Sequence, residues 1–293
     1  AGAWVCEATA GDERDRELGS LQSAGQAHAQ SVMGLQTWNS MRALDFLLEL
    51  PDVDSTRIGV TGASGGGTQT FILGAVDPRP TVAFPAVMVS TAMQGGCTCE
   101  NACGLRVGMG NVDFAAMFAP KPLGMTAAND WTREMPTKGF PELQRHYALL
   151  GAPDMVSLTA RLEFGHNYNS VGRAAMYSWM NRHLRLGLAE PIVEQDYRRL
   201  TREEMSVWDA QHPRPAGGPD FERGLLRWWT EDTTRQLRTA LATSGEFRRL
   251  AGGALEVVVG RALPKPGEVT WKAVARAEAS GVREFRGLLR NGL

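Results

Sequence analysis

A serine set among glycines is the residue whose type and surroundings most clearly indicate chemistry. Ser64 lies in a Gly-Ala-Ser-Gly-Gly motif at 62–66, directly after a β-branched run at 58–61 and directly before a helix-like stretch at 68–76. The small residues let a sharp strand-to-helix turn close, and the serine hydroxyl is then held out at the end of the strand. The N–H of Gly65, at the helix N-terminus, points to where an oxyanion would form. We therefore expect Ser64 to be a nucleophile.

A serine nucleophile needs a base, and His166 is the histidine best placed to be one, because an imidazole can take the serine proton near neutral pH. His166 follows the last expected strand, in a loop whose glycine and asparagine leave the ring free to be aimed. His183, beside two arginines on a helix, reads as a surface position. The other histidines fall in a polar stretch, within a helix and in a proline-rich linker: His28, His146 and His212.

The acid that orients the histidine is expected to be Asp130. A carboxylate holds the imidazole in the right tautomer and stabilises the imidazolium. Asp130 ends the expected strand that lies between Ser64 and His166 in chain order. Other aspartates have simpler explanations, since they start a helix or lie in turns with proline: Asp77, Asp113 and Asp154.

The glycine turn allows two other interpretations. A phosphate-binding P-loop ends in Gly-Lys-Ser/Thr, but here Thr68 follows glycine without a lysine. The turn also resembles that of short-chain dehydrogenases, but their pattern requires glycine at position 68. Their Tyr-x-x-x-Lys pair is absent, and the turn follows a long helical segment rather than opening a domain. We therefore expect no nucleotide cofactor.

Composition narrows the class of protein. A chain of 293 residues can form one large α/β domain, or a domain with a substantial appendage. Its formal net charge of -1 gives no broad affinity for nucleic acid, and no apolar run is long enough to span a membrane. The chain begins without methionine, so we expect the native start to lie upstream, which leaves a secreted or periplasmic protein open.

Three cysteines are clustered in a glycine-rich stretch, at Cys97, Cys99 and Cys103. Structural zinc sites need four ligands in paired C-x-x-C or C/H spacing, and redox pairs use C-x-x-C. Neither spacing is present, so we expect small buried thiols and no metal.

Strand-like and helix-like segments alternate through the first two thirds of the chain, which indicates a largely parallel sheet with helices on both faces. Ligands of such sheets bind beyond the carboxyl ends of the strands. Ser64, Asp130 and His166 each follow an expected strand, so all three should lie at that edge. Strands are expected at 3–9, 57–61, 81–89, 121–127 and 155–164, and helices at 31–50, 68–76, 111–119, 141–150 and 170–186.

The character of the chain changes from Glu190 onward. Prolines and a Gly-Gly-Pro at 217–219 mark a linker, and Thr201-x-x-Glu204 is a capping-box pattern. Helices are expected at 221–241 and 247–261, and a strand at 268–274. We therefore divide the chain into a catalytic domain at 1–189 and a linker with a helical extension at 190–293, or the start of a further module.

The order Ser64, Asp130, His166 with its glycine elbow resembles the α/β-hydrolase superfamily, and within it bacterial acetylxylan-esterase-like and prolyl-oligopeptidase-like serine esterases. The phrases that carry the resemblance are at 57–69, 129–132 and 165–169, and it covers residues 30 to 187. It implies an eight-stranded sheet, an acyl-enzyme mechanism and ester substrates, often carbohydrate esters. It implies neither a metal nor an organic cofactor.

The front of the family domain is not recognisable, because the superfamily places about four strands before the elbow strand and only one, near Trp4, is found here. The loop that would give a second oxyanion N–H is not recognisable before Ser64 either. We expect a front that is incomplete or divergent. Two alternatives to an esterase stay open: a weakly catalytic binding module with this fold, and a serine peptidase of the prolyl-oligopeptidase type.

Overall fold

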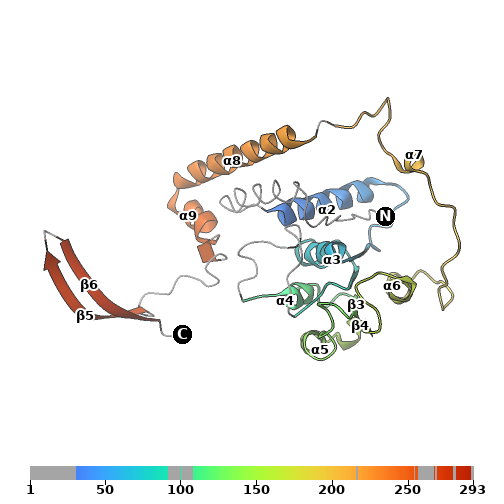
Figure 1. Cartoon of the computed structure of the whole chain (residues 1–293), viewed down its shortest axis with the longest axis horizontal. Coiled ribbons are helices and arrows are strands. Elements are labelled where there is room, and N and C mark those ends of the chain that lie inside the picture. The colour runs from blue at the N-terminus through green and yellow to red at the C-terminus, as the bar shows by residue number, and fades with distance from the viewer. Residues whose placement is uncertain are drawn as a thin grey trace.

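The computed structural model describes residues 31–91, 100, 108–215, 217–253, 255–256, 267, 269–279 and 282–291. Strands and helices alternate up to residue 184, and a long extended arm then leads to further helices and a hairpin (Figure 1). The expected strand at 3–9, His28 and the three clustered cysteines, Cys97, Cys99 and Cys103, lie outside the described residues.

The first part of the chain is built on a parallel sheet of four strands in the order β1-β2-β3-β4. This confirms the expected α/β class, with four of the implied eight strands present among the described residues. All four carboxyl ends point to one edge, because every pairing is parallel. The strands are β1 (Gly59–Ala63), β2 (Val82–Ala86), β3 (Leu123–Ala128) and β4 (Val156–Arg161).

The two central strands are buried along their whole length, as expected for a sheet covered on both faces. One face packs on α3, α4 and α5 through a cluster that includes Phe71, Phe114 and Tyr147. The opposite face packs on α6, where Trp179 and Met180 contact Val82 and Phe84. These helices are α3 (Gly65–Val76), α4 (Asn111–Ala116), α5 (Gly139–Leu149) and α6 (Ser170–Leu184).

Helix α2 (Val32–Glu49) lies outside α3, and Leu44 packs there against Ile58 and Leu73. It begins at Ser31, whose hydroxyl accepts a hydrogen bond from the N–H of Gly34 at 2.9 Å. The helix ends just before Pro51, as the sequence predicts.

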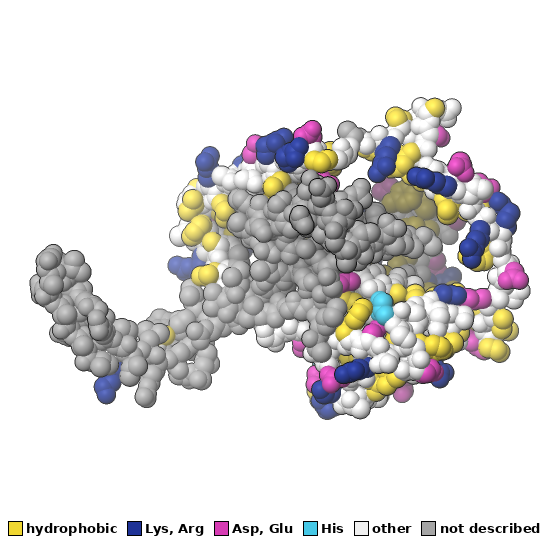
Figure 2. Space-filling view, in the orientation of Figure 1, with side chains coloured by type: hydrophobic (Ala, Val, Ile, Leu, Met, Phe, Trp, Pro, Cys, Tyr) yellow, Lys and Arg dark blue, Asp and Glu magenta, His cyan; other side chains and the backbone are white. Residues whose placement is uncertain are grey.

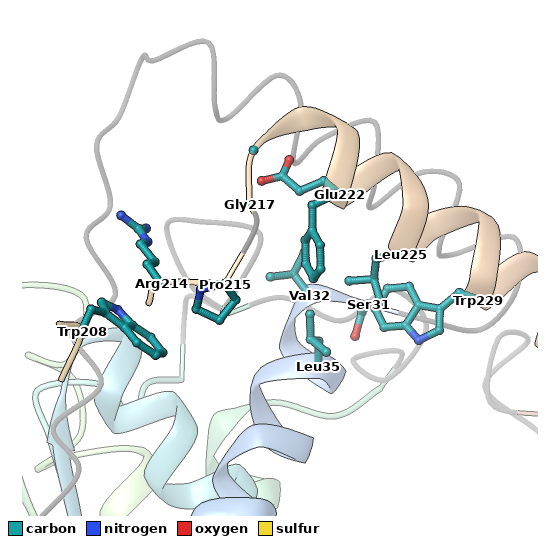
Figure 3. Close-up of a pocket in the computed structure, with 12 residues that line it drawn as sticks. Ser31, Val32, Leu35, Trp208, Arg214, Pro215, Gly217, Glu222, Leu225 and Trp229 are labelled. Atoms are coloured by element: carbon teal, nitrogen blue, oxygen red, sulfur yellow. The ribbon is translucent and has the colours of Figure 1, made fainter. Parts of the chain in front are cut away.

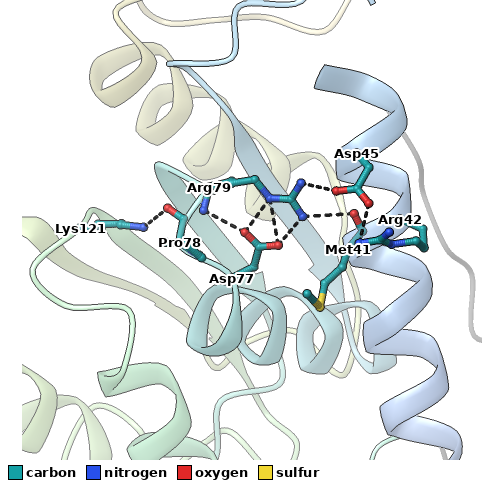
Figure 4. A network of polar contacts seen from close by, with 7 residues as sticks. All are labelled: Met41, Arg42, Asp45, Asp77, Pro78, Arg79 and Lys121. Carbon is teal, nitrogen blue, oxygen red and sulfur yellow. Dashed lines mark hydrogen bonds and ion pairs between the residues drawn. The ribbon is translucent and has the colours of Figure 1, made fainter. Parts of the chain in front are cut away.

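An ion-pair network fixes α2 to the turn that follows α3 (Figure 4). Arg79 donates to the buried carboxylate of Asp77 at 2.5 Å and to Asp45 of α2 at 2.5 Å. The hydrogen bond from Arg79 holds the pKa of Asp77 below its ordinary value. Lys121, just before β3, donates to the carbonyl of Pro78 at 2.5 Å, so the turn is held from both sides.

The arm after α6 is exposed, but its first residues are fixed to that helix. Glu190 accepts from Ser178 and Asn181, and Glu194 accepts from Arg173. Charged and apolar side chains are interspersed along the arm and α8 (Figure 2). The arm contains α7 (Arg202–Met205), where the predicted capping box between Thr201 and Glu204 forms.

The C-terminal part contains the expected long helix, α8 (Pro219–Leu241), followed by a short helix and a π-helical turn, α9 (Ser244–Phe247) and η3 (Arg248–Gly252). The expected strand at 268–274 is β5 (Val269–Ala279). It pairs antiparallel with β6 (Val282–Asn291), a strand that the sequence patterns did not indicate.

Candidate active site

The nucleophile elbow forms where it is expected, between β1 and α3. Ser64 has φ 55° and ψ -125°, a backbone conformation that is strained for a residue with a side chain. A Cβ atom at Gly62 would lie 2.5 Å from the carbonyl carbon and oxygen of Gly66. Only glycine fits at position 62, since the atoms it would meet belong to the backbone. The G-x-S-x-G spacing is therefore a packing requirement of the turn.

Backbone hydrogen bonds fix the elbow at both ends. The N–H of Ser64 donates to the carbonyl of Ala86 on β2 at 3.1 Å, and its own carbonyl accepts from Thr68 at 3.0 Å. Gly65 is the first residue of α3, and its N–H donates to no protein group within the described part of the chain. The donor is free at a helix N-terminus, where the helix dipole favours negative charge.

Asp130 follows β3 and is oriented by its own turn. One carboxylate oxygen accepts from the backbone N–H of Thr132 at 2.7 Å and from its hydroxyl at 2.5 Å. The Asp130 side chain is 5% exposed. Burial alone would raise its pKa, but hydrogen bonds from His166 and Thr132 outweigh burial and hold the pKa below the ordinary value. The carboxylate is thus kept ionised and directed at the histidine.

His166 lies in the loop between β4 and α6 and contacts this carboxylate. Its Nδ1 is 2.8 Å from Oδ2 of Asp130, and its ring centroid is 4.3 Å from that of Trp131. The imidazole side chain is 33% exposed, so the ring contacts Asp130 and Trp131 and still has a part that is open to solvent. With Nδ1 facing Asp130, Nε2 is the nitrogen left for proton transfer.

The structure therefore brings two of the three expected residues into contact and places the third at the same edge of the sheet. No hydrogen bond joins the Ser64 hydroxyl to His166 among the described residues. Catalytic hydrogen bonds often tighten only when substrate is bound. The Ser64–His166 step remains a prediction.

The competing candidates occupy structural positions. Asp77 pairs with Arg79, and Asp113 accepts from the N–H of Gly110 at 2.7 Å at the start of α4. Asp154 lies in the short 3-10 turn η2 (Pro153–Met155). The expectation for His183 was wrong: it is half-buried, with its ring 4.1 Å from Trp179, because α6 turns that side toward the sheet.

Three residues at this edge were not singled out from the sequence. Trp131 covers one face of the histidine ring, and Thr132 orients the aspartate. The Asp-x-Thr pattern of an Asx-turn was a usable signal for Thr132. Val87, directly after β2, has φ 45°, a strained conformation that sequence does not indicate in a β-branched residue.

A cavity of about 460 Å³ lies elsewhere, between the start of α2 and α8, and none of the three candidate residues lines it. Figure 3 shows Val32 and Leu35 of α2 opposite Leu225 and Trp229 of α8. Within the described residues, no cluster of three or more metal-binding side chains is present. Among these described residues, no helix is long and apolar enough to cross a membrane.

No protein-family model matches the chain. Over 77 residues it is 34% identical to the 4-O-methyl-glucuronoyl methylesterase 1 of Sodiomyces alcalophilus. The matched segment is 26% of this chain and 15% of that protein. Among solved structures, Methylesterase BT1017 matches with 34% identity and a TM-score of 0.50, covering 56% of this chain and 38% of the other. This chain has the α/β-hydrolase fold of esterases.

The match to this α/β-hydrolase fold confirms the resemblance seen in the sequence. A carbohydrate esterase family 15 glucuronoyl esterase from Caldicellulosiruptor kristjansonii also matches, at 17% identity and a TM-score of 0.46, covering 61% of this chain and 57% of the other. The chain spans less than two thirds of the length of each of these relatives.

Proposed function

We propose that this α/β-hydrolase chain is a serine carbohydrate esterase in which Ser64 is the nucleophile, His166 the base and Asp130 the orienting acid. The observation that carries the proposal is the 2.8 Å contact between His166 and Asp130 at the sheet edge that also bears the strained Ser64 elbow. Strain at one residue and a buried, oriented carboxylate behind an open imidazole are costly features that functional sites retain.

In the first half of the reaction, the Ser64 oxygen attacks the carboxyl carbon of the ester while Nε2 of His166 takes the hydroxyl proton. Asp130 stabilises the imidazolium through the hydrogen bond at Nδ1. The Gly65 N–H donates to the oxyanion of the tetrahedral intermediate. The intermediate collapses as the imidazolium gives its proton to the leaving alcohol, which departs and leaves an acyl-enzyme.

In the second half, His166 takes a proton from water, and the hydroxide oxygen adds to the acyl carbon. Collapse of this second intermediate breaks the bond to the Ser64 oxygen, which recovers its proton from His166. The free acid leaves, and the enzyme returns to its starting state.

We propose methyl esters of sugar acids as the substrate class. Both relatives that are 34% identical to this chain are methylesterases by name, and one is a glucuronoyl methylesterase. The acyl group on Ser64 would then be the sugar acid, and the first product methanol.

The test combines fluorophosphonate labelling with product analysis. We expect the probe to label Ser64 and the protein to release methanol from methyl glucuronate. Ser64→Ala should lose about 10^4-fold or more of the activity, since the attacking oxygen is gone. Ser55→Ala, a change at an exposed turn, is the control and should keep full activity. If Ser64→Ala keeps most of the activity, the assignment of Ser64 as the nucleophile is wrong. If acetylated sugars are cleaved instead, the substrate class alone is wrong.

A further inference from the structure

A tyrosine in the histidine loop makes a contact with the elbow strand that the proposed reaction does not use. The hydroxyl of Tyr168 is 2.8 Å from Oγ1 of Thr61, on β1. Thr61 donates its one hydroxyl proton to the carbonyl of Phe84 at 2.7 Å, so Tyr168 must be the donor in the contact between them. Burial raises the pKa of Tyr168 to about 12, so the phenol keeps this proton through the neutral range.

The same residue is also held through its backbone. Arg173 donates to the carbonyl of Tyr168 at 2.6 Å. The guanidinium is fixed in turn by Glu194, which accepts from it at 2.5 and 2.7 Å. Tyr168 is therefore anchored by its hydroxyl on the sheet and by its carbonyl on α6.

The two residues of this contact are close in sequence to Ser64 and His166, the two residues that must meet in catalysis. Thr61 lies on β1, three residues before Ser64, and Tyr168 comes two residues after His166. The contact joins residues that are 107 positions apart in the chain. It links the elbow strand β1 directly to the histidine loop, which the Asp130 contact does not do, because Asp130 follows a different strand, β3.

We propose that Tyr168 is a positioning residue: by donating its phenol hydrogen bond to Thr61, it keeps the histidine loop docked on the elbow strand, so that His166 can reach Ser64 when substrate is bound. The proposal rests on the proposed esterase function. Its consequence is specific: removing the hydroxyl should slow the chemical steps while leaving substrate binding unchanged, because neither tyrosine nor threonine needs to touch the substrate.

The central variant is Tyr168→Phe, which removes one oxygen and keeps the ring. Small misplacements of reacting groups can cost about 10^2-fold, so we expect kcat to fall about 10- to 100-fold with little change in KM. Tyr147→Phe is the matched control, because that buried tyrosine also donates one hydrogen bond, to the Lys121 carbonyl at 3.0 Å, away from the site. It should lose comparable stability and keep its kcat.

Variants of the acceptor separate positioning from a general effect on stability. Thr61→Val should lower kcat at least as much as Tyr168→Phe does, because it removes the contact with Tyr168 and also the hydrogen bond to the Phe84 carbonyl. The double variant should be no worse than Thr61→Val alone, since the contact with Tyr168 is already lost there. Thr61→Ser keeps the oxygen and should restore kcat. The proposal is overturned if Tyr168→Phe keeps its kcat, if the two losses add, or if Thr61→Ser is as slow as Thr61→Val.

A spectroscopic readout distinguishes failure of this proposal from failure of the proposed function. The low-field proton resonance of His166 Nδ1–H, assigned by its loss in His166→Gln, should shift or broaden in Tyr168→Phe and not in Tyr147→Phe. If the unmodified chain hydrolyses no ester but the resonance responds in this way, the function is wrong and the positioning contact stands. If the chain is active and neither kcat nor the resonance responds, the contact has no positioning role.

Discussion

Replacing Asp130 by asparagine tests how the histidine is oriented. Thr132 directs two donors, its N–H at 2.7 Å and its hydroxyl at 2.5 Å, at one oxygen of the Asp130 carboxylate. In Asp130→Asn the amide oxygen must take that place, which turns the NH₂ group toward His166. Because an NH₂ group donates, Nδ1 must accept and the imidazole proton must move to Nε2. His166 then presents a proton to Ser64 where it should accept one.

The magnitude follows from this wrong tautomer. Such an exchange in a serine triad lowers kcat about 10^4-fold, which corresponds to about 5.4 kcal/mol of transition-state stabilisation. The fold should persist, because asparagine has nearly the same shape and both bonds from Thr132 are kept. The loss should therefore be in kcat, with KM and the circular dichroism spectrum little changed.

The assay is hydrolysis of an activated aryl ester at active-site concentrations calibrated with a fluorophosphonate. Asp154→Asn is the matched control, since that carboxylate lies in the η2 turn, and full activity is expected. The reasoning is refuted if Asp130→Asn keeps more than a tenth of the wild-type kcat, or if Asp154→Asn is the variant that loses it.

Two further predictions concern stability. Arg79→Ala removes the guanidinium from the Asp77 carboxylate, which is 2% exposed and keeps the backbone N–H of residue 79 as a donor, and should lower the free energy of unfolding by about 3 kcal/mol. Arg42→Ala, at a side chain that is 53% exposed, should lower it by about 0.5 kcal/mol or less in the same denaturant titration. Because the pKa of Asp130 is lowered in the folded state, its stabilising effect is present above its unfolded pKa and is lost as pH falls through the folded value. The difference in melting temperature between wild type and Asp130→Asn should thus be constant at neutral pH and shrink below about pH 4, and a difference that grows in acid would contradict the assignment.

The sequence was sufficient to predict those elements whose conformation depends on contacts between residues a few positions apart. The elbow could be predicted from sequence, because the need for glycine at position 62 comes from the backbone of Gly66, only four residues away. The start of α2 at Ser31 and the capping box at Thr201 follow for the same reason, since a side chain there pairs with its own first turn. The alternation of strands and helices was equally readable, and it placed Ser64, Asp130 and His166 at one edge.

The ends of the strands were less predictable. The apolar run at 81–89 reads as one long strand, but β2 stops at Ala86, because Val87 leaves the extended conformation with φ 45°. Its N–H still donates to Thr126 on β3. Strand β6 was missed since its sequence is interrupted by Gly287 and rich in arginine, and its ladder depends on pairing with β5.

Only the tertiary structure decided which side chains meet. The order of the motifs predicted that Asp130 would orient His166, 36 residues further on, and the structure supplied the contact. Nothing in the sequence indicated that Thr61 and Tyr168, 107 residues apart, would pair. Their contacts exist because β1, β3 and β4 run parallel in one sheet and deliver their carboxyl ends to the same edge. Sequence by itself determined the types of group at that edge. Packing of α6 and of the sheet determined their distances, because those depend on atoms contributed from every part of the domain.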